Sequence, residues 1–249
     1  MFKMNLNIPS YIITMQGNQT SELLSQQCFD SAKKFSIEPK IFPAIHGKQI
    51  DIEWEKHNLK DFKFNQRIKK LSLGMKGCTL SHFLLWKKSI EINKPILILE
   101  HDALIIRPIP HSIVAKFDEV CNLDRLSRLT TDYDNKVQEH RGEGVTVFMK
   151  SRPMASGLEL YNKTHIKGAH GYIVKPQGAQ RLVDWVWASG ALASDVSINS
   201  ISCVLTYSDT SYCRINPQFW NSKRMKGTNS FTRPNKQDKK LMREANNGI

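Results

Sequence analysis

The amino-acid sequence predicts an α/β fold built around a parallel sheet, and two stretches carry that prediction. Residues 11–14, 20–35 and 39–45 have the patterns of a strand, a helix and a second strand. Such a βαβ unit joins parallel strands through a right-handed crossover. Farther along, five consecutive apolar residues within 94–103 run directly into three polar residues. An unbroken apolar run is typical of a strand that is buried on both faces of a parallel sheet.

The predicted buried strand ends in Glu100-His101-Asp102. Open α/β sheets bind ligands at the carboxyl ends of their strands. Glu100 and Asp102 are two residues apart, so on an extended backbone both side chains point to the same side. Two converging carboxylates suit Mg²⁺ or Mn²⁺, which can in turn hold a phosphate. The alternative is a strand that simply ends in polar residues at the surface.

Length and composition bound the class of protein. The chain has 249 residues, of which 40% are hydrophobic and 24% are charged, as in an ordinary soluble globular protein. It contains no run of 18 apolar residues, so we expect no transmembrane segment. Residues 1–7 lack the apolar core of a secretory signal, so we expect a cytoplasmic protein.

The cysteines and the charge give two further constraints. The five cysteines are widely spaced and include no C-x-x-C pair, which favours reduced thiols over a disulfide framework or a zinc site. Cys78 lies in an apolar stretch and is expected in the core rather than as a nucleophile. The net charge of +13 favours polyanionic partners, namely nucleic acid, an acidic membrane surface or a phosphorylated substrate.

A basic stretch and a helix connect the two parts of the predicted sheet. Residues 54–76 hold seven Lys or Arg and two acidic residues, which indicates either a solvated helical insertion or a basic face for an anionic acceptor. Gly74 and Gly77 predict a turn. The helix that follows would place Ser81 and His82 near its N-terminus, where free backbone N–H groups attract anions.

The second half of the chain continues the α/β pattern. We expect a helix near 113–120, strands at 145–149 and 169–174, and a helix from Pro176. The apolar run 201–207 completes the apparent core. We therefore predict a single domain over residues 1–220, followed by a basic tail. Residues 221–249 hold eight Lys or Arg and two acids, a net charge of +6.

Several motifs together resemble glycosyltransferase family 25, which includes bacterial lipooligosaccharide galactosyltransferases. The similar segments are Tyr11-Ile12-Ile13, Phe42-Pro43-Ala44-Ile45-His46-Gly47, Gly77-Cys78-Thr79-Leu80-Ser81-His82 with Trp86, Ile98-Leu99-Glu100-His101-Asp102-Ala103, Gly171-Tyr172 through Gly178-Ala179 to Leu182, and Asp195. The chain also departs from the family pattern. His101 replaces the middle acid of Glu-Asp-Asp, and Lys76 replaces the acid before Gly-Cys. The arginine usual after the first strand is not evident in 16–22.

The resemblance implies a GT-A-like three-layer nucleotide-sugar-binding fold with a mixed, mostly parallel central sheet. It implies that Glu100 and Asp102 hold Mn²⁺ or Mg²⁺ on the diphosphate of a UDP-sugar, with His101 as a third ligand or a neighbour of the ion. Ser81 and His82 are the further residues expected at the donor. For His82 the alternative is a cap on its own helix.

An inverting transferase also needs a general base beside the acceptor hydroxyl. Asp195 is the first candidate and His170 the second. The alternatives are that Asp195 caps a helix and that His170 is a packed or surface histidine. The leading hypothesis is therefore a metal-dependent inverting transferase that moves galactose or glucose from a UDP-sugar to a cell-surface glycan such as lipooligosaccharide.

Two rival functions follow from the same residues. The basic composition also suits sugar transfer onto modified bases of nucleic acid, as in phage DNA, which requires base flipping. His101 in place of an acid suits a binding module with a degenerate glycosyltransferase fold and no catalysis.

An anionic glycan or glycolipid acceptor would also bring the protein into peripheral contact with the inner face of a membrane.

Overall fold

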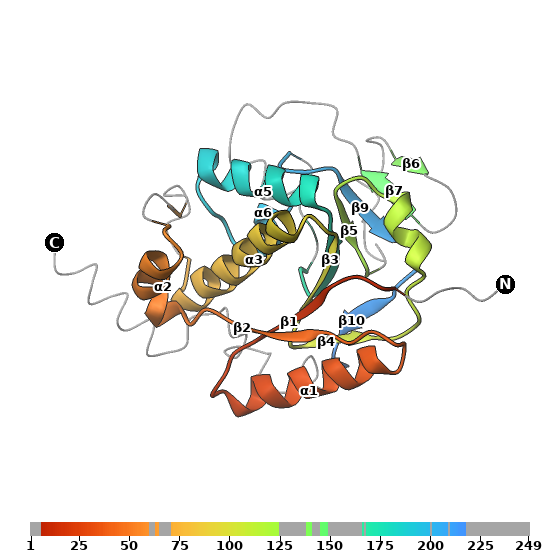
Figure 1. The fold of residues 1–249 in the computed structure, drawn as a ribbon, viewed down its shortest axis with the longest axis horizontal. Coiled ribbons are helices and arrows are strands. Elements are labelled where there is room, and N and C mark those ends of the chain that lie inside the picture. Colours follow the sequence, from red (N-terminus) through yellow and green to blue (C-terminus); the bar gives the residue numbers. More distant parts are fainter. Residues whose placement is uncertain are drawn as a thin grey trace.

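A computed structural model describes residues 6–59, 63–64, 71–124, 138–140, 145–148, 166, 168–199, 201–208 and 210–217 (Figure 1). Within them, eight strands form one sheet in the order β2-β1-β3-β8-β5-β9-β7-β6, and β10 pairs with β4 in a small second sheet. The strands of the large sheet are β2 (Lys40–Pro43), β1 (Ser10–Thr14), β3 (Ile96–Glu100), β8 (Gly171–Val174), β5 (Val120–Asn122), β9 (Leu205–Ser208), β7 (Val145–Phe148) and β6 (Gln138–His140). Those of the small sheet are β4 (Ala103–Ile105) and β10 (Cys213–Ile215).

The strand directions confirm a mixed, mostly parallel sheet. β1 is parallel to both β2 and β3, and β5 is parallel to β9. β8 is antiparallel to β3 and to β5, and β7 is antiparallel to β9 and to β6. Six of the eight strands therefore run in one direction, and only β8 and β7 oppose them.

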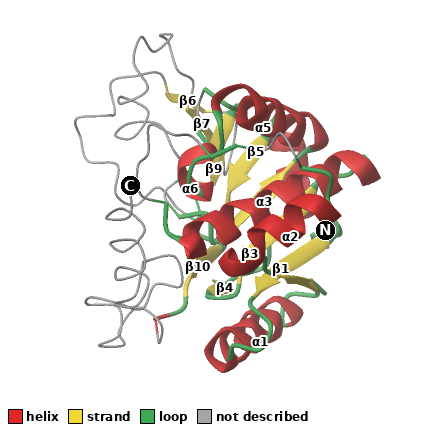
Figure 2. Ribbon diagram, turned by 90° about the vertical axis from the view of Figure 1, so that its left-hand side faces the viewer, coloured by secondary structure: helices red, strands yellow, loops and turns green. Residues whose placement is uncertain are grey.

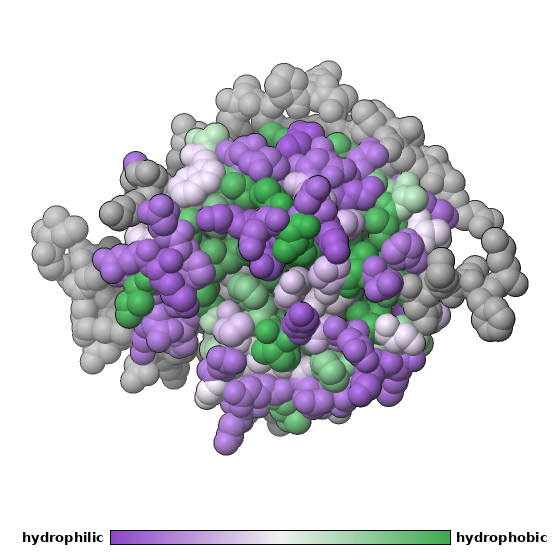
Figure 3. Space-filling view, viewed as in Figure 1, coloured by the Kyte–Doolittle hydropathy of each residue, from purple (hydrophilic) through white to green (hydrophobic). Residues whose placement is uncertain are grey.

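Helices cover both faces of the sheet, which gives the three layers that were predicted (Figures 1 and 2). The helices are α1 (Gln19–Lys33), η1 (Gly47–Gln49), α2 (Ile50–Lys56), α3 (Leu73–Ile92), η2 (His111–Lys116), α5 (Pro176–Ser189) and α6 (Ser194–Ser197). α1 packs on one face, and α3 and α5 pack on the other. In the space-filling view, hydrophilic residues lie over α1 and over α5 at opposite edges (Figure 3).

Strand β3 is buried on both faces, as its apolar run predicts. Ile96 and Ile98 pack in the core beneath α3 and α5, whereas Leu97 and Leu99 pack against α1. All four side chains are fully buried. Because successive strand residues point to opposite faces, this one strand contributes to both cores and fixes the helices on either side.

The opening βαβ unit is confirmed with one difference at its helix. The helix was predicted from residue 20, but α1 begins at Gln19 and its N-cap is Asn18, whose Oδ1 accepts a hydrogen bond from Ser21 N at 3.0 Å. Ser21 Oγ instead accepts a hydrogen bond from Met15 N at 2.9 Å. The hydroxyl thus fixes the turn that joins β1 to α1.

The turn predicted at Gly74 and Gly77 is wrong, because both glycines lie inside α3. The helix begins at Leu73 and is capped by Ser72. A Cβ atom on Gly77 would lie 2.2 Å from the carbonyl oxygen of Ile45, so glycine is needed for contact between helix and backbone. Ser81 and His82 therefore lie in the third turn of α3, and the prediction that they sit at a helix N-terminus is also wrong.

Other predictions agree in part with the structure. The helix expected near 113–120 is the 3-10 helix η2, which ends before strand β5. The strand near 169–174 and the helix from Pro176 are confirmed as β8 and α5. Much of the basic stretch 54–76 and the whole predicted tail 221–249 lie outside the described residues. Among the described helices, none combines the length and apolar character needed to cross a membrane.

Candidate functional site

The end of β3 is where the predicted site residues meet. Ile13 of β1 is in register with Glu100, so the parallel strands β1 and β3 end side by side. β8 runs in the opposite direction, so its beginning meets the end of β3, and Glu100 N donates a hydrogen bond to the carbonyl of His170 at 2.9 Å. His101 and Asp102 follow in a turn. Glu100, His101, Asp102 and His170 thus share one edge of the sheet.

Glu100 is tied to α3 through a buried chain of polar groups. Its Oε1 lies 3.1 Å from His82 Nε2, and His82 Nδ1 lies 2.8 Å from the hydroxyl of Tyr172. Trp86 Nε1 donates to that hydroxyl at 2.9 Å. Burial raises the pKa of Glu100, but the hydrogen bond and the electrostatic attraction of His82, with smaller effects of His101 and His170, together lower it by more. Glu100 is therefore ionised at neutral pH.

Asp102 lies in a different environment. Only 8% of the residue is exposed, and its Oδ1 has no hydrogen-bond partner among the described residues. Burial and the negative charge of Glu100 raise the pKa of Asp102 to about 7, against the opposing influence of His170. A buried carboxylate oxygen without a donor is costly, and a cation would satisfy it.

The geometry of the carboxylate pair differs from its prediction. The extended backbone that would point Glu100 and Asp102 to one side ends at Glu100, because the next two residues form a turn. The Glu100 carboxylate contacts α3. The charge of Asp102 raises the pKa of Cys28 on α1 as well as that of Cys78 on α3, after the larger effect of burial on each thiol.

The two candidate bases, Asp195 and His170, lie in α6 and directly before β8. Asp195 lies in the first turn of α6, whose N-cap is Ala193, so the alternative that Asp195 caps the helix is wrong. Its charge contributes to the raised pKa of Cys78. His170 is buried, and its Nε2 lies 3.5 Å from Oδ2 of Asp124. Neither ring nitrogen of His170 makes a hydrogen bond among the described residues.

Ser81 has well-defined contacts next to the site. Its buried hydroxyl donates to the carbonyl of Gly77 at 2.8 Å and accepts from Ile45 N at 2.8 Å. These bonds join α3 to the segment that follows β2. Because its only proton is already donated, the role of Ser81 at a donor phosphate stays a prediction.

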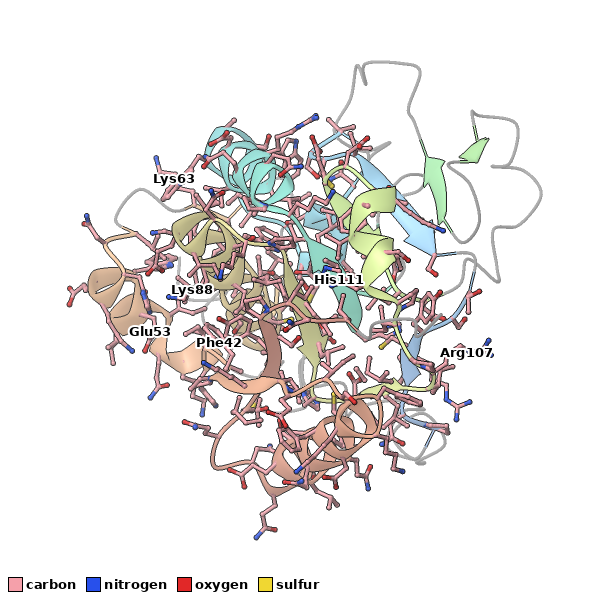
Figure 4. The ribbon with its side chains drawn as sticks, turned by 45° about the vertical axis from the view of Figure 1, so that its right-hand side comes forward. Phe42, Glu53, Lys63, Lys88, Arg107 and His111 are labelled. Atoms are coloured by element: carbon pink, nitrogen blue, oxygen red, sulfur yellow. The ribbon has the colours of Figure 1, made fainter. Side chains whose placement is uncertain are left out.

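A pocket of about 820 Å³ opens at the carboxyl ends of β1 and β2. This volume is within the range of small-molecule sites. Its lining comes from the ends of β1 and β2, from η1 and α2, and from α3: Met15, Gln16, Phe42, Pro43, Ala44, Ile45, His46, Lys48, Gln49, Glu53, Lys56, His57 and Leu84. Figure 4 shows Phe42 and Glu53, which come from β2 and α2. Ile45 links the pocket to Ser81 and hence to the helix that holds His82.

The sequence did not identify three residues as parts of this site. Tyr172 and Trp86 belong to the motifs quoted above, but their contact depends on the packing of α3 against β8. Cys78 is half-buried at the site, with Sγ 3.9 Å from Glu100 Oε1 and 3.5 Å from Ser194 Oγ. Burial, followed by the charge of Glu100, raises its pKa well above the usual value, so the group stays a thiol and is a poor nucleophile.

The three-layer α/β fold, with a mixed, mostly parallel sheet and a pocket at the carboxyl ends of its strands, is consistent with a GT-A-like glycosyltransferase fold. Residues 7–198 match the model of "Glycosyltransferase family 25 (LPS biosynthesis protein)". The match spans most of the chain, and the protein belongs to this family. It is therefore a transferase enzyme of LPS biosynthesis, which disfavours the alternative of a non-catalytic binding module. The comparison with curated proteins found no match.

Proposed function

We propose that the protein transfers galactose or glucose from a UDP-sugar to a lipooligosaccharide-type glycan, with inversion at the anomeric carbon and with Mn²⁺ or Mg²⁺ as cofactor. The observation that carries the proposal is the pocket at the ends of β1 and β2. It lies beside the strand that ends in Glu100, since β1 pairs with both β2 and β3. A nucleoside in the pocket would direct its diphosphate toward Glu100 and Asp102.

The residues at this edge fit a hard divalent ion. Asp102 Oδ1 is buried and has no hydrogen-bond donor among the described residues, and Glu100 is ionised. Carboxylate oxygens are preferred ligands of Mg²⁺ and Mn²⁺. Glu100 and Asp102 would hold the ion, which when bound neutralises charge on the leaving diphosphate. Burial lowers the pKa of His101, against the opposing charge of Glu100, and this lowering favours the uncharged imidazole beside a cation.

The chain's own residues supply the other requirement, a base for the acceptor hydroxyl. Asp195 is the first candidate, and His170, next to Asp124, is the second. The base removes the hydroxyl proton, and the acceptor oxygen forms a bond to the anomeric carbon. The bond between that carbon and the diphosphate oxygen breaks at the same time, and UDP leaves. A general base of this kind contributes about 10²–10⁴-fold to the rate.

The acceptor is proposed from the family description and from charge. LPS biosynthesis supplies anionic glycan and glycolipid acceptors, and a net charge of +13 attracts them. On this proposal the enzyme acts at the inner face of the membrane. Nucleic acid as acceptor depends on the same charge. Retention on duplex DNA at about 50 mM salt, where phosphate contacts persist, would support it.

A thermal-shift screen with UDP-galactose, UDP-glucose and other nucleotide sugars, each with Mn²⁺ or with EDTA, tests the donor. We expect a UDP-hexose to raise the melting temperature only with Mn²⁺, because a ligand that binds the folded state stabilises it. The matched variant Glu100→Gln should lose this shift. A shift of equal size in EDTA would contradict metal dependence, and no shift with any nucleotide sugar would contradict the donor site.

A further inference from the structure

We propose that Trp86, Tyr172 and His82 form a one-directional hydrogen-bond relay that positions the Glu100 carboxylate. In this relay His82 is a donor and not a metal ligand. The importance of Glu100 rests on the proposed function, but the direction of the relay does not. The relay consists of three contacts of 2.9, 2.8 and 3.1 Å that lead from Trp86 Nε1 to Glu100 Oε1.

The chemistry at the two ends fixes the direction of the chain. An indole N–H can only donate, so Trp86 gives its proton to the oxygen of Tyr172. An ionised carboxylate can only accept, so Glu100 must receive a proton from His82 Nε2. The single hydroxyl proton of Tyr172 is then donated to His82 Nδ1. In this arrangement His82 carries its donated proton on Nε2, and its Nδ1 accepts from Tyr172.

The reverse arrangement leaves polar groups unsatisfied. With the proton of His82 on Nδ1, its Nε2 lone pair would face the Glu100 carboxylate at 3.1 Å. The hydroxyl proton of Tyr172 would also lose its acceptor. His82, Trp86 and Tyr172 are all fully buried, so water does not compensate for either loss. An unsatisfied buried polar group is costly, so one tautomer is selected.

The fold holds the relay rigidly. His82 and Trp86 are four residues apart on α3 and lie on the same face of the helix. Tyr172 is in β8, directly beside β3, in register with Ile98. α3 thus supplies two members of the relay, and β8 and β3 supply one each. Oε1 of Glu100 is fixed, while its other oxygen, on a side chain that is 26% exposed, is left for a ligand.

A competing interpretation is a site for a thiophilic ion such as Zn²⁺. Donor atoms of Cys78, His82 and Glu100 all lie within 4.8 Å of one another. Cysteine and histidine are typical zinc ligands. Coordination by His82 Nε2, however, would move the proton to Nδ1 and leave the Tyr172 hydroxyl without an acceptor. In the relay, His82 Nε2 therefore donates a hydrogen bond to Glu100 and does not coordinate an ion.

Histidine-selective ¹⁵N NMR of the full-length protein tests the relay directly, with His82→Gln to assign the signal. We expect wild-type His82 to carry its proton on Nε2 with Nδ1 as an acceptor, and Tyr172→Phe to shift part of the population to the form protonated on Nδ1. Val186→Ala is the matched control, because it truncates a buried side chain of α5 outside the relay. This control should leave the His82 signal unchanged.

Titration calorimetry of Mn²⁺ in the presence of UDP gives a second readout. Partners that orient a ligand group typically contribute about 10–100-fold to metal affinity. We expect Tyr172→Phe to weaken Mn²⁺ binding by about tenfold or more, and Val186→Ala by less than about twofold.

Several results would overturn the relay. They are a wild-type His82 protonated on Nδ1, an Nε2 signal that moves to a metal-bound position with Zn²⁺, or unchanged Mn²⁺ affinity in Tyr172→Phe. If the wild type has the expected tautomer and the variant loses Mn²⁺ affinity, but no UDP-sugar is turned over, the proposed function fails and the relay stands.

Discussion

His82 Nε2 and Glu100 Oε1 lie 3.1 Å apart, and this contact joins the helix that closes one face of the sheet to the strand at its centre. The hydrogen bond, together with the nearby histidines, keeps Glu100 ionised despite its burial. Asp102 has no such donor for its Oδ1 among the described residues, and its pKa is raised to about 7. Two carboxyl groups two residues apart therefore differ in protonation, and this difference leads to separate predictions.

Glu100→Gln should abolish sugar transfer. The amide keeps the shape of the side chain but loses the charge that a metal diphosphate needs, so we expect UDP-sugar turnover to fall by about 100-fold or more. The control Glu91→Gln removes an acid whose side chain is 68% exposed on the same helix as His82 and which pairs with Lys88 at the surface. Turnover above about a third of the wild-type rate in Glu100→Gln would rule out its assigned role.

Asp102→Asn should stabilise the protein at high pH in the absence of divalent ions. The pKa of Asp102 is about 7 in the folded chain and near 3.8 in the unfolded chain, so the folded state binds the extra proton between these values. The contribution of Asp102 to wild-type stability therefore falls as the pH rises from about 4 to 7. Urea unfolding should show Asp102→Asn close to wild type at pH 4. Above pH 7 it should be more stable by about 1–3 kcal/mol.

A difference between Asp102→Asn and wild type that does not vary with pH would contradict this account of Asp102. Mn²⁺ supplies a second check, because it should stabilise the wild type but have much less effect on the asparagine variant, which lacks the charged ligand.

Gly77→Ala should destabilise the fold, because the new Cβ atom would lie 2.2 Å from the carbonyl oxygen of Ile45 and force helix and loop apart. We expect a loss of about 1–3 kcal/mol in the free energy of unfolding. Gly17→Ala is the comparison, since Gly17 has open space around it but a positive φ of 76°. Its expected loss is about 1–2 kcal/mol from backbone conformation alone. A neutral Gly77→Ala would contradict the close packing of α3.

Ala44→Trp should fill part of the pocket at the ends of β1 and β2. We expect the KM for the UDP-sugar to rise by about tenfold, with a smaller change in kcat, because the variant blocks binding that is common to substrate and transition state. Ile52→Trp is the matched control, because Ile52 is 63% exposed on α2 and does not line the pocket. Equal KM values for the two variants would place the donor elsewhere.

Asp195→Asn and His170→Gln separate the two candidate bases. If Asp195 removes the acceptor proton, its variant should lose about 10²–10⁴-fold in kcat while the KM for the UDP-sugar stays within about twofold. His170→Gln should then retain most of the activity. The opposite pattern would show that His170, whose Nε2 lies 3.5 Å from Asp124 Oδ2, is the general base.

The sequence predicted the features that depend on local pattern. The βαβ opening, the buried strand β3 and the strand and helix around Pro176 follow from periodicity, and all three are present. Gly77 was misread because glycine signals a turn locally, whereas here it serves a contact with Ile45, distant in the sequence. The turn after Glu100 likewise follows from the pairing of β4 with β10, which no local pattern shows.

The polar contacts of the site were the least predictable part. Glu100 and His82 were singled out, but as independent ligands of the donor. Their bond, and its extension to Tyr172 and Trp86, arises only when α3 packs across β3 and β8. Asp124 was not predicted, because only the pairing of β5 with β8 brings it close to His170.

The central claim is that the edge of the sheet at Glu100 and Asp102 holds the metal diphosphate of a UDP-hexose. Release of UDP from UDP-galactose and UDP-glucose, measured with Mn²⁺ or EDTA for wild type and Glu100→Gln, tests it most directly. We predict release by the wild type with Mn²⁺, and at least about 100-fold slower release in EDTA or by the variant. Equal release by the wild type in Mn²⁺ and in EDTA, or full release by Glu100→Gln, would contradict the claim.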